Sequence, residues 1–364
     1  MVRKMAARAA LVVSDEHPGF LHPAQNRAAA KGAGCAYVTV DDATGVPMAL
    51  FPKEEFAART LRPKMAKVQD AWLLPLEDPE PTVAPPKRLA LPFDPVDLSR
   101  ANLASLVTGC AIDHAVPAVE TCPGGSRQAE ARLHRFLRDK LTGYAVDRND
   151  PSCDATTHLS PHLHWGAISA RRIALAVREA AAERGAAESG EALLEQLLVR
   201  RGLAFNFSAR SPDPTRYDSL PAWARATLEA HGRDQRPALY DRDALEEART
   251  GDELWNAAQL ELRARGTIHG YARMLWGKLP ITWTKTPREA HTHLVYLNDK
   301  YALDGRDPDG WTNIGWCFGL HDRPWPERSI YGTVRTMTSK SARSKLDFED
   351  YIAQAPRWRD EAGA

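Results

Sequence analysis

The sequence lacks several features that would point to particular classes of protein. Its 364 residues include only five cysteines, which are scattered and form no Cys-x-x-Cys pair, so neither a disulfide framework nor a cysteine zinc site is indicated. No apolar run approaches the roughly 18 residues of a membrane span, and the N-terminus has no signal-peptide core. These absences predict a reduced, cytoplasmic protein that does not insert into a membrane.

The chain also lacks an excess of either charge. Lys and Arg number 48 and Asp and Glu 47, which excludes a globally basic nucleic-acid-binding protein but leaves room for a local basic patch. A hydrophobic content of 43% and a mean hydropathy of −0.44 exclude an extended disordered chain. The absence of GxSxG, Walker A and GxGxxG motifs gives no support to three common enzyme classes.

The N-terminal residues predict a small α/β unit. Residues 9–14 and 35–40 have the composition of buried parallel strands, and an alanine-rich helix is expected at 23–31 between them. Two parallel strands are not a stable sheet by themselves, so this unit either packs on the rest of the protein or is a remnant of a larger α/β domain. A second helix, rich in Lys and Arg, is expected near 53–74.

A linker and a large helical region follow. Seven prolines between residues 75 and 95 exclude a helix or a central strand there. We therefore predict a partial α/β domain over 1–75, a proline-rich linker over 76–98 and a helical domain over 99–364. Within that domain helical patterns cover 127–141, 168–184, 190–207, 222–231, 243–249, 253–277 and 287–301.

Tryptophan is the residue type with the most uneven distribution. Nine of the ten tryptophans follow residue 160, and Trp276 and Trp283 are two helical turns apart, roughly 10 Å along a helix axis. Indoles at such a spacing, with Trp255 nearby, suit electron hopping, although an aromatic stripe is far more often part of a core. Pro280 predicts a kink or break between Trp276 and Trp283.

The C-terminal region carries a local positive charge. Between residues 321 and 345 six Lys or Arg outnumber Asp322 and Glu327 by four, and Trp325 and Tyr331 lie among them. This mixture is typical of a surface that follows phosphates, and on composition an ordinary basic face is equally compatible. The basic residues are Arg323, Arg328, Arg335, Lys340, Arg343 and Lys345. The pair Arg200-Arg201 is a smaller candidate of the same kind.

The histidines do not form a metal motif. His291 and His293 form a second pair, but metal-binding histidines on a helix stand at i and i+4 with further ligands, and Pro161 breaks that spacing between His158 and His162. We therefore predict no metal site.

Several long motifs occur in order along the helical region. They are RNDP (148–151), LSPHLHWG (159–166), LLVRRGLAFNF (197–207), WNAAQLEL (255–262), HGYARMLWGK (269–278), YLNDKYALDGRDPDGW (296–311) and GLHDRPWPER (319–328). Together they resemble the photolyase/cryptochrome superfamily and, within it, the class II cyclobutane pyrimidine dimer photolyases. The resemblance runs from about Leu11 to about Ile352, nearly the whole chain.

This resemblance implies a fold and a cofactor. The fold would be an α/β N-terminal domain, here an incomplete Rossmann-like antenna domain, followed by a large all-α domain that binds a U-shaped FAD. Arg273 and Asp304 match a salt-bridge pair beside the flavin ring, and Asn298 matches the asparagine at flavin N5. The residues that match contacts of the FAD phosphates and ribityl chain are Tyr144, Arg148, Thr156, Thr157, His158, Leu159 and Ser160.

The resemblance also implies a reaction. Light would drive an electron from reduced flavin to a cyclobutane pyrimidine dimer in DNA, which splits and returns the electron. Trp276, Trp255 and Trp283 match the family's electron-transfer chain, with Trp276 nearest the flavin. Met274 and Trp316 match residues that touch the extruded lesion. Extruding a dimer from the duplex costs less free energy than extruding a normal base pair, because the dimer stacks poorly.

Several positions depart from the family pattern. Gln196 replaces a glutamate that contacts the lesion, and Gly202 and Phe205 each replace an acidic residue. The terminal signature over 331–338 loses a lysine and an aromatic residue. Met1 falls just before a mid-domain strand of the family layout, so we expect a shortened antenna domain, and an antenna pigment such as deazaflavin or folate is weakly supported.

Three interpretations stay open. The leading one is a light-driven DNA lyase of reduced or shifted efficiency, because Met274, Trp316 and the basic tail are retained. Loss of glutamate at positions 196 and 202 favours the second, a photoreceptor or electron-transfer flavoprotein without repair. The third is a truncated, poorly folded product. No obligate protein partner is evident, so we expect a monomer.

Overall fold

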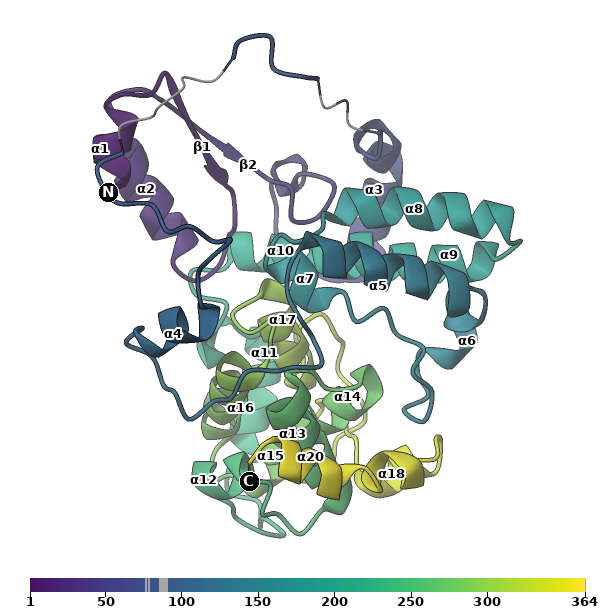
Figure 1. Ribbon diagram of the computed structural model, residues 1–364. Helices are drawn as coiled ribbons and strands as arrows, with labels where there is room; N and C mark the ends of the chain where they lie inside the picture. Colours follow the sequence, from purple (N-terminus) through teal and green to yellow (C-terminus); the bar gives the residue numbers. More distant parts are fainter. Residues whose placement is uncertain (76, 78, 85–90, 364) are drawn as a thin grey trace.

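The N-terminal part of the protein is one βαβ unit (Figure 1). The computed structural model describes residues 1–75, 77, 79–84 and 91–363. In it β1 (Leu11–Asp15) pairs in parallel with β2 (Ala36–Val40), and α2 (His22–Gly32) connects the two strands. The predicted βαβ unit is therefore confirmed.

One face of this small sheet is exposed, so the expectation of buried strands is wrong. Val13 on β1 is 59% exposed and Val38, its partner on β2, is 46% exposed. The other face packs on α2, where Asn26 Oδ1 accepts hydrogen bonds from Ser14 and Tyr37. A parallel sheet is buried only when helices cover both faces, and the described residues supply a helix on one.

A basic helix, α3 (Ala58–Trp72), connects this unit to the helical region. Its buried residues Leu61 and Met65 face α10 (Arg201–Arg210), where a Cβ added at Gly202 would lie 3.1 Å from the Met65 methyl group. The loop before α3 is held by Asn206, which is fully buried and donates to the carbonyls of residues 51 and 53. Glycine at 202 thus allows α3 and α10 to pack closely.

The helical region has two hydrophobic cores. The first lies among α3, α5 (Ser126–Asp139), η2 (Leu141–Gly143), α6 (Tyr144–Asp147), α7 (Ser160–His164), α8 (Ala170–Glu183), α9 (Ala187–Leu194), η3 (Glu195–Arg200) and α10. The second lies among α11 (Ala222–Ala230), α12 (Arg242–Glu246), α13 (Glu253–Arg265), α14 (Gly270–Lys278), α15 (Pro280–Trp283), α16 (Pro287–Tyr301), α17 (Pro308–Cys317), α18 (Ser339–Arg343), α19 (Glu349–Ile352) and α20 (Ala355–Glu361).

Other elements are short. They are α1 (Val2–Ala6), η1 (Met48–Leu50), α4 (Leu103–Thr108) and η4 (Tyr217–Ser219). Of the predicted linker, residues 76, 78 and 85–90 lie outside the described part of the chain, including Pro85 and Pro86. None of the described helices is both long and apolar enough to cross a membrane.

The single helix expected over 253–277 is wrong, because the chain breaks between α13 and α14. Gly266 ends α13 in the left-handed conformation, with φ of 64°, a conformation that glycine adopts without strain. The predicted break at Pro280 is confirmed, since this proline stands in the first turn of α15.

Candidate functional site

Buried polar groups without partners mark a cradle at the N-terminus of α14. Within the described residues, Arg148 Nε and His269 Nε2 are buried and have no hydrogen-bond partner. The backbone N–H of Tyr271 donates to His269 Nδ1 at 3.3 Å, so the neutral ring carries its proton on Nε2. Burial lowers the pKa of His269 and keeps the ring neutral. Both unpartnered atoms are therefore donors.

The exposed Gly270 leaves open space at the start of α14. A Cβ added at Gly270, the first residue of α14, would meet no atom within 4 Å. The dipole of a helix N-terminus favours an anion there, while the Tyr271 N–H is already bound to His269. We therefore assign the first turn of α14, Arg148 and His269 to an anion-binding cradle.

The loop between α6 and α7 lies near His269. His158 has a positive φ of 51°, and its Nε2 contacts the Asp154 carboxylate at 2.5 Å and Thr156 Oγ1 at 3.3 Å. The pKa of His269 is affected by His158, which places this loop beside the N-terminus of α14. A non-glycine residue in this conformation is strained, and such strain is concentrated at functional sites.

The other residues of the predicted phosphate and ribityl group lie along the same loop. Tyr144 is buried, with the Arg148 guanidinium 5.7 Å from its ring. Thr157 Oγ1 accepts a hydrogen bond from the Leu159 N–H at 3.3 Å, and Ser160 begins α7. The structure thus brings the predicted residues into one loop that ends at a helix.

Glu261 on α13 is a site residue that the sequence analysis missed. Its Oε2 accepts the Tyr351 hydroxyl at 2.5 Å and the His269 N–H at 3.0 Å. Burial raises the pKa of Glu261, and the positive charge of Arg273 opposes that rise. Its position in the motif WNAAQLEL was the only available signal, because Tyr351 is distant in sequence.

Asn298 occupies a tight position between α16 and α17. It is 3% exposed, and its Nδ2 donates to Asp299 Oδ1 at 3.0 Å. A Cβ added at Gly310 would lie 2.8 Å from that Nδ2. The expected ion pair of Arg273 with Asp304 is not formed in the part of the chain that the structure describes.

Replacing Gly310 by alanine tests this close contact. The added methyl group must displace the Asn298 amide, and overpacking of this kind typically costs about 1–3 kcal/mol. We expect a lower urea midpoint for Gly310→Ala. Gly124→Ala is the control, because a Cβ there meets nothing within 4 Å. Equal midpoints for both variants would contradict the assigned packing.

The three tryptophans of the predicted chain are buried and adjacent. Trp276 Nε1 donates to Gln259 Oε1 at 2.9 Å, and Trp255 Nε1 donates to the Trp276 carbonyl at 2.9 Å. The rings of Trp255 and Trp283 are 5.6 Å apart between centroids and nearly perpendicular. Trp255 thus lies between the other two, bonded to the backbone carbonyl of Trp276 and packed on the ring of Trp283.

A second group of residues lies around Trp316 on α17. The Arg200 guanidinium lies 5.1 Å from the Trp316 ring, and the Cys317 thiol donates to the Met274 carbonyl at 3.8 Å. Met274 is 45% exposed, and Gln196 is also exposed. This group is therefore accessible, unlike the tryptophan path.

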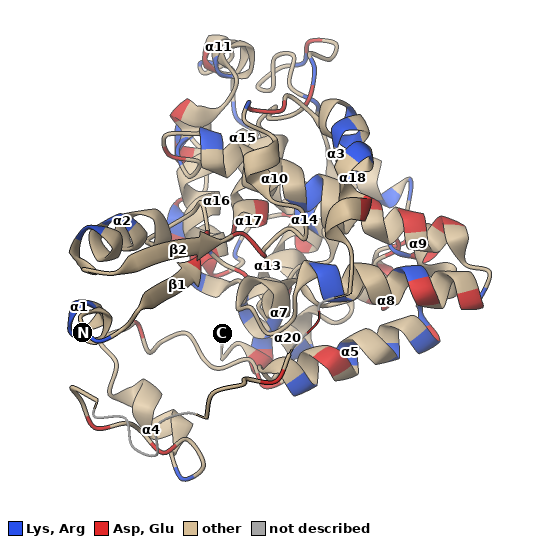
Figure 2. Ribbon diagram, turned by 90° about the horizontal axis from the view of Figure 1, so that it is seen from above, with Lys and Arg blue, Asp and Glu red and all other residues tan. Residues whose placement is uncertain are grey.

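The helix predicted over 190–207 changes geometry beside this group. Between α9 and α10 the segment η3 is a π-helix with wider turns. Such segments are rare and are frequently found at functional sites. Figure 2 shows basic positions on the neighbouring α3, where Arg62 binds Glu195 of η3 through two hydrogen bonds.

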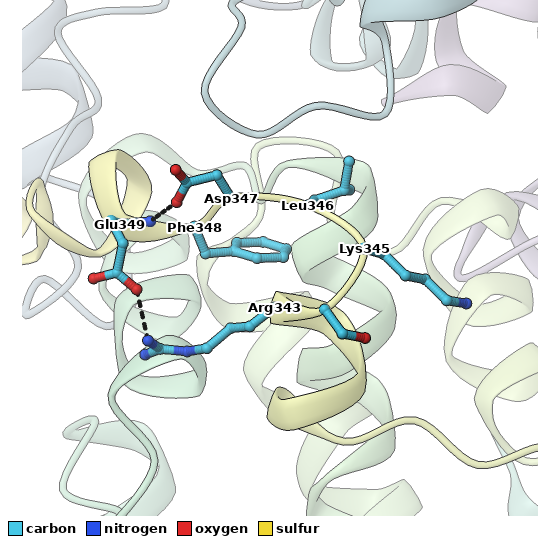
Figure 3. Close-up of a pocket in the computed structure, with 7 residues that line it drawn as sticks. Arg343, Lys345, Leu346, Asp347, Phe348 and Glu349 are labelled. Carbon is cyan, nitrogen blue, oxygen red and sulfur yellow. Dashed lines mark hydrogen bonds and ion pairs between the residues drawn. The ribbon is translucent and has the colours of Figure 1, made fainter.

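The six basic residues of the C-terminal tail are not equivalent. Arg343 binds Glu253 and, at 2.7 Å, Glu349, which is visible in Figure 3 at the rim of a pocket of about 370 Å³ around Phe348. Among the described residues the other five form no ion pair and are exposed: Arg323, Arg328, Arg335, Lys340 and Lys345. The guanidinium groups of Arg323 and Arg335 lie 5.3 and 4.9 Å from the Trp325 ring.

A polar cluster joins the N-terminal unit to α7 and α17. Ligand-type atoms of His17, His164 and Asp307 lie within 4.8 Å of one another, but their contacts are those of a hydrogen-bonded network. His164 Nδ1 lies 3.0 Å from Asp307, and Arg201 binds the same carboxylate. His17 Nδ1 accepts the Gly19 N–H, so the neutral ring has its proton on Nε2 and no free lone pair for a metal.

Comparison with solved structures identifies the fold. A cryptochrome of Synechocystis sp. PCC6803 has a TM-score of 0.71 at 16% identity and covers 98% of this chain and 70% of its own. A bacterial class III photolyase of Agrobacterium tumefaciens has a TM-score of 0.66 at 18% identity, covering 97% of this chain and 70% of its own. The chain has the photolyase/cryptochrome fold.

Comparison with known sequences identifies homologues. Proteins named deoxyribodipyrimidine photo-lyase are 40% identical over 335 residues in Oryza sativa, 37% over 313 residues in Methanothermobacter thermautotrophicus and 33% over 317 residues in Potorous tridactylus. They cover 89%, 85% and 86% of this chain. The chain spans 64%, 66% and 58% of their lengths, and no protein-family model matches it. These photolyases are homologues of the chain.

The observed cradle fits the flavin cofactor that this fold implies. Arg148 Nε and His269 Nε2 are buried donors without partners, as a diphosphate group requires. Open space at Gly270 admits such a group, which a side chain there would restrict. The donor set therefore agrees with a dinucleotide.

Proposed function

We propose that this protein is a light-driven flavoenzyme of the class II type that splits cyclobutane pyrimidine dimers in DNA. The observation that carries the proposal is the arrangement of α14. Its N-terminus forms the anion cradle, Trp276 begins the tryptophan path, and Met274 lies next to the exposed group around Trp316. One helix thus joins three functions that dimer splitting requires.

The residues would act on the cofactor as follows. When bound, reduced FAD would supply the electron that splits the dimer. Arg148 and His269 would hold its diphosphate through charge-assisted hydrogen bonds. Arg273 would place a positive charge near the flavin ring, beside the buried carboxyl group of Glu261, whose pKa is raised by burial. The Asn298 amide has both a donor and an acceptor, so it tolerates protonated and unprotonated flavin N5.

The DNA would lie across the exposed groups. The five unpaired cations of the C-terminal tail would neutralise phosphates, which supply most of the affinity and make it salt-dependent. Met274 and Trp316 would contact the extruded dimer. We propose that the protein acts on DNA as a monomer.

The deciding experiment measures dimer loss under blue light. The purified, photoreduced protein is mixed with a short oligonucleotide that contains one thymine dimer, and intact dimers are counted after illumination. We expect loss that requires both light and flavin. Normal flavin content without any dimer loss would contradict the proposal.

The competing function is a flavoprotein photoreceptor or electron-transfer protein without repair. The observation in its favour is that Gln196 is exposed and that Gly202 and Phe205 are buried in packing contacts, so none of the three offers an acid to a lesion. In that case light would still reduce the flavin, while dimers in DNA would persist.

Restoring the acid at position 196 is expected to improve repair. A protonated carboxyl donates a stronger hydrogen bond than an amide, by a factor of roughly two, to a carbonyl that gains negative charge. Exposed glutamate has a pKa near 4.3, so a minor fraction of the introduced carboxyl is protonated at pH 5 and almost none at pH 8. We therefore expect the repair yield of Gln196→Glu, relative to wild type, to rise as the pH is lowered from 8 to 5. The measurement is dimer loss per absorbed photon at matched flavin content. A yield that is equal at both pH values would show that residue 196 does not face the lesion.

A further inference from the structure

Arg200 lies over the half-buried ring of Trp316. It is the last residue of the π-helical segment η3, and its guanidinium lies 5.1 Å from the centroid of that ring. Its Nε donates to Glu195 Oε1 at 3.2 Å. The guanidinium group is thus hydrogen-bonded to a carboxylate through Nε and lies over an indole ring.

The charge of this arrangement is positive. Glu195 is shared between Arg62 and Arg200, which together lower the pKa of its carboxyl against the effect of burial. Two guanidinium groups and one carboxylate leave a net charge of about +1 beside Trp316. In the described part of the chain, the two terminal NH₂ groups of Arg200 form no hydrogen bond. They are therefore free to bind a ligand that rests on this ring.

Other side chains near the ring cannot supply the same charge. Burial lowers the pKa of His321 to about 4, so this ring is neutral, and its Nδ1 is bound to the Phe56 carbonyl. Gln196 is neutral and has no hydrogen bond among the residues that the structure describes. The charged donor at this position is Arg200.

We propose that Arg200 is a further substrate-contacting residue, which binds the pyrimidine carbonyl oxygens of an extruded dimer and stabilises the negative charge on that dimer during splitting. This inference rests on the proposed function. The supplied electron adds to the dimer, the two carbon–carbon bonds that join the rings break, and the electron returns. A guanidinium group keeps its proton in proteins, so no proton is transferred.

The permanent positive charge of Arg200 would thereby stabilise the dimer in the way that a carboxylic acid at position 196 would. A preorganised charged donor at a site of developing negative charge typically contributes a hundredfold or more to a rate. Splitting competes with unproductive return of the electron, so the measurable effect is smaller. We expect removal of this charge to lower the repair yield by about tenfold.

The test compares two substitutions at one position with a matched control. Arg200→Met removes the charge and keeps the length of the side chain, whereas Arg200→Lys keeps the charge without the planar donors. Arg242→Met is the control, because Arg242 is exposed and lies 4.7 Å from the Tyr296 ring, a contact of the same kind. Flavin content is measured first and is expected to be equal in all proteins.

Two readouts follow. The first is the dark affinity for a single-stranded oligonucleotide with one thymine dimer, relative to the same oligonucleotide without it, and the second is dimer loss per absorbed photon. We expect Arg200→Met to lose several-fold in dimer preference and about tenfold in yield, Arg200→Lys to lie between it and wild type, and Arg242→Met to match wild type. A repair yield equal to wild type in Arg200→Met would overturn the role of Arg200 and leave the proposed function in place. Absence of repair by the wild type would overturn the proposed function and the catalytic role of Arg200 with it.

Discussion

Trp276→Phe is expected to abolish light-driven reduction of the flavin in the absence of free thiols. Trp276 is the first member of the path, and its carbonyl accepts the indole N–H of Trp255. Trp255 in turn lies 5.6 Å from Trp283 between ring centroids. A phenyl ring is much harder to oxidise than an indole, so the path would lose its first donor.

The measurement is flavin absorbance during blue illumination at matched flavin content. Trp358→Phe is the control, because Trp358 is also buried but packs on Tyr351 outside the path. Loss of the indole in Trp276→Phe leaves Gln259 Oε1 without its donor, which costs about 1–3 kcal/mol, so folding is checked by urea unfolding. Photoreduction at the wild-type rate would mean that these tryptophans are core residues only.

Arg148→Met is expected to release most of the flavin. The wild-type protein should be yellow and hold one FAD per chain, and its buried Arg148 Nε is a donor without a partner among the described residues. Hydrogen bonds to charged groups contribute about 1.5–3 kcal/mol, which corresponds to at least tenfold weaker binding once the donor is removed. The Tyr144 ring would also lose the guanidinium that lies 5.7 Å away.

Flavin released on heating, counted per chain, gives the result directly. Arg178→Met is the control, because Arg178 binds Asp70 at the surface and is remote in sequence from the cradle loop. Flavin content equal to wild type in Arg148→Met would remove Arg148 from the cradle. A colourless, folded wild-type protein would contradict flavin binding as a whole.

The fold was largely predictable because its signals are local. The hydrophobic periodicity, the turn residues and the positions of the prolines indicated the βαβ unit and most helices. Pro280 correctly predicted the break before α15. The break between α13 and α14 was missed, because a single glycine can stand inside a helix. Only the structure shows that Gly266 is in the left-handed conformation and ends α13. The exposed face of β1 and β2 was missed because an apolar strand has the same composition whether or not a second layer covers it.

The candidate site was likewise predictable from the sequence only in part. The motifs named Arg273, Asn298 and the tryptophans, because a family signature is a local string of residues. The contacts of Glu261 with Tyr351, and of Arg200 with Trp316, join residues 90 and 116 positions apart, and only packing brings them together. The expected partner of Arg273 was Asp304, yet the buried carboxylate whose pKa responds to Arg273 is Glu261.

The sequence by itself determined the class of fold, and its motifs predicted the residues of the cofactor and lesion groups and the three tryptophans. The tertiary structure alone decided which atoms in those groups are left without partners and which charges meet. Among the described residues Arg148 Nε and His269 Nε2 are buried without a hydrogen-bond partner, and Arg200 lies over Trp316 because α10, which continues the π-helical segment, packs against α17. Such contacts depend on distances across the core, and spacing along the chain carries no information about them.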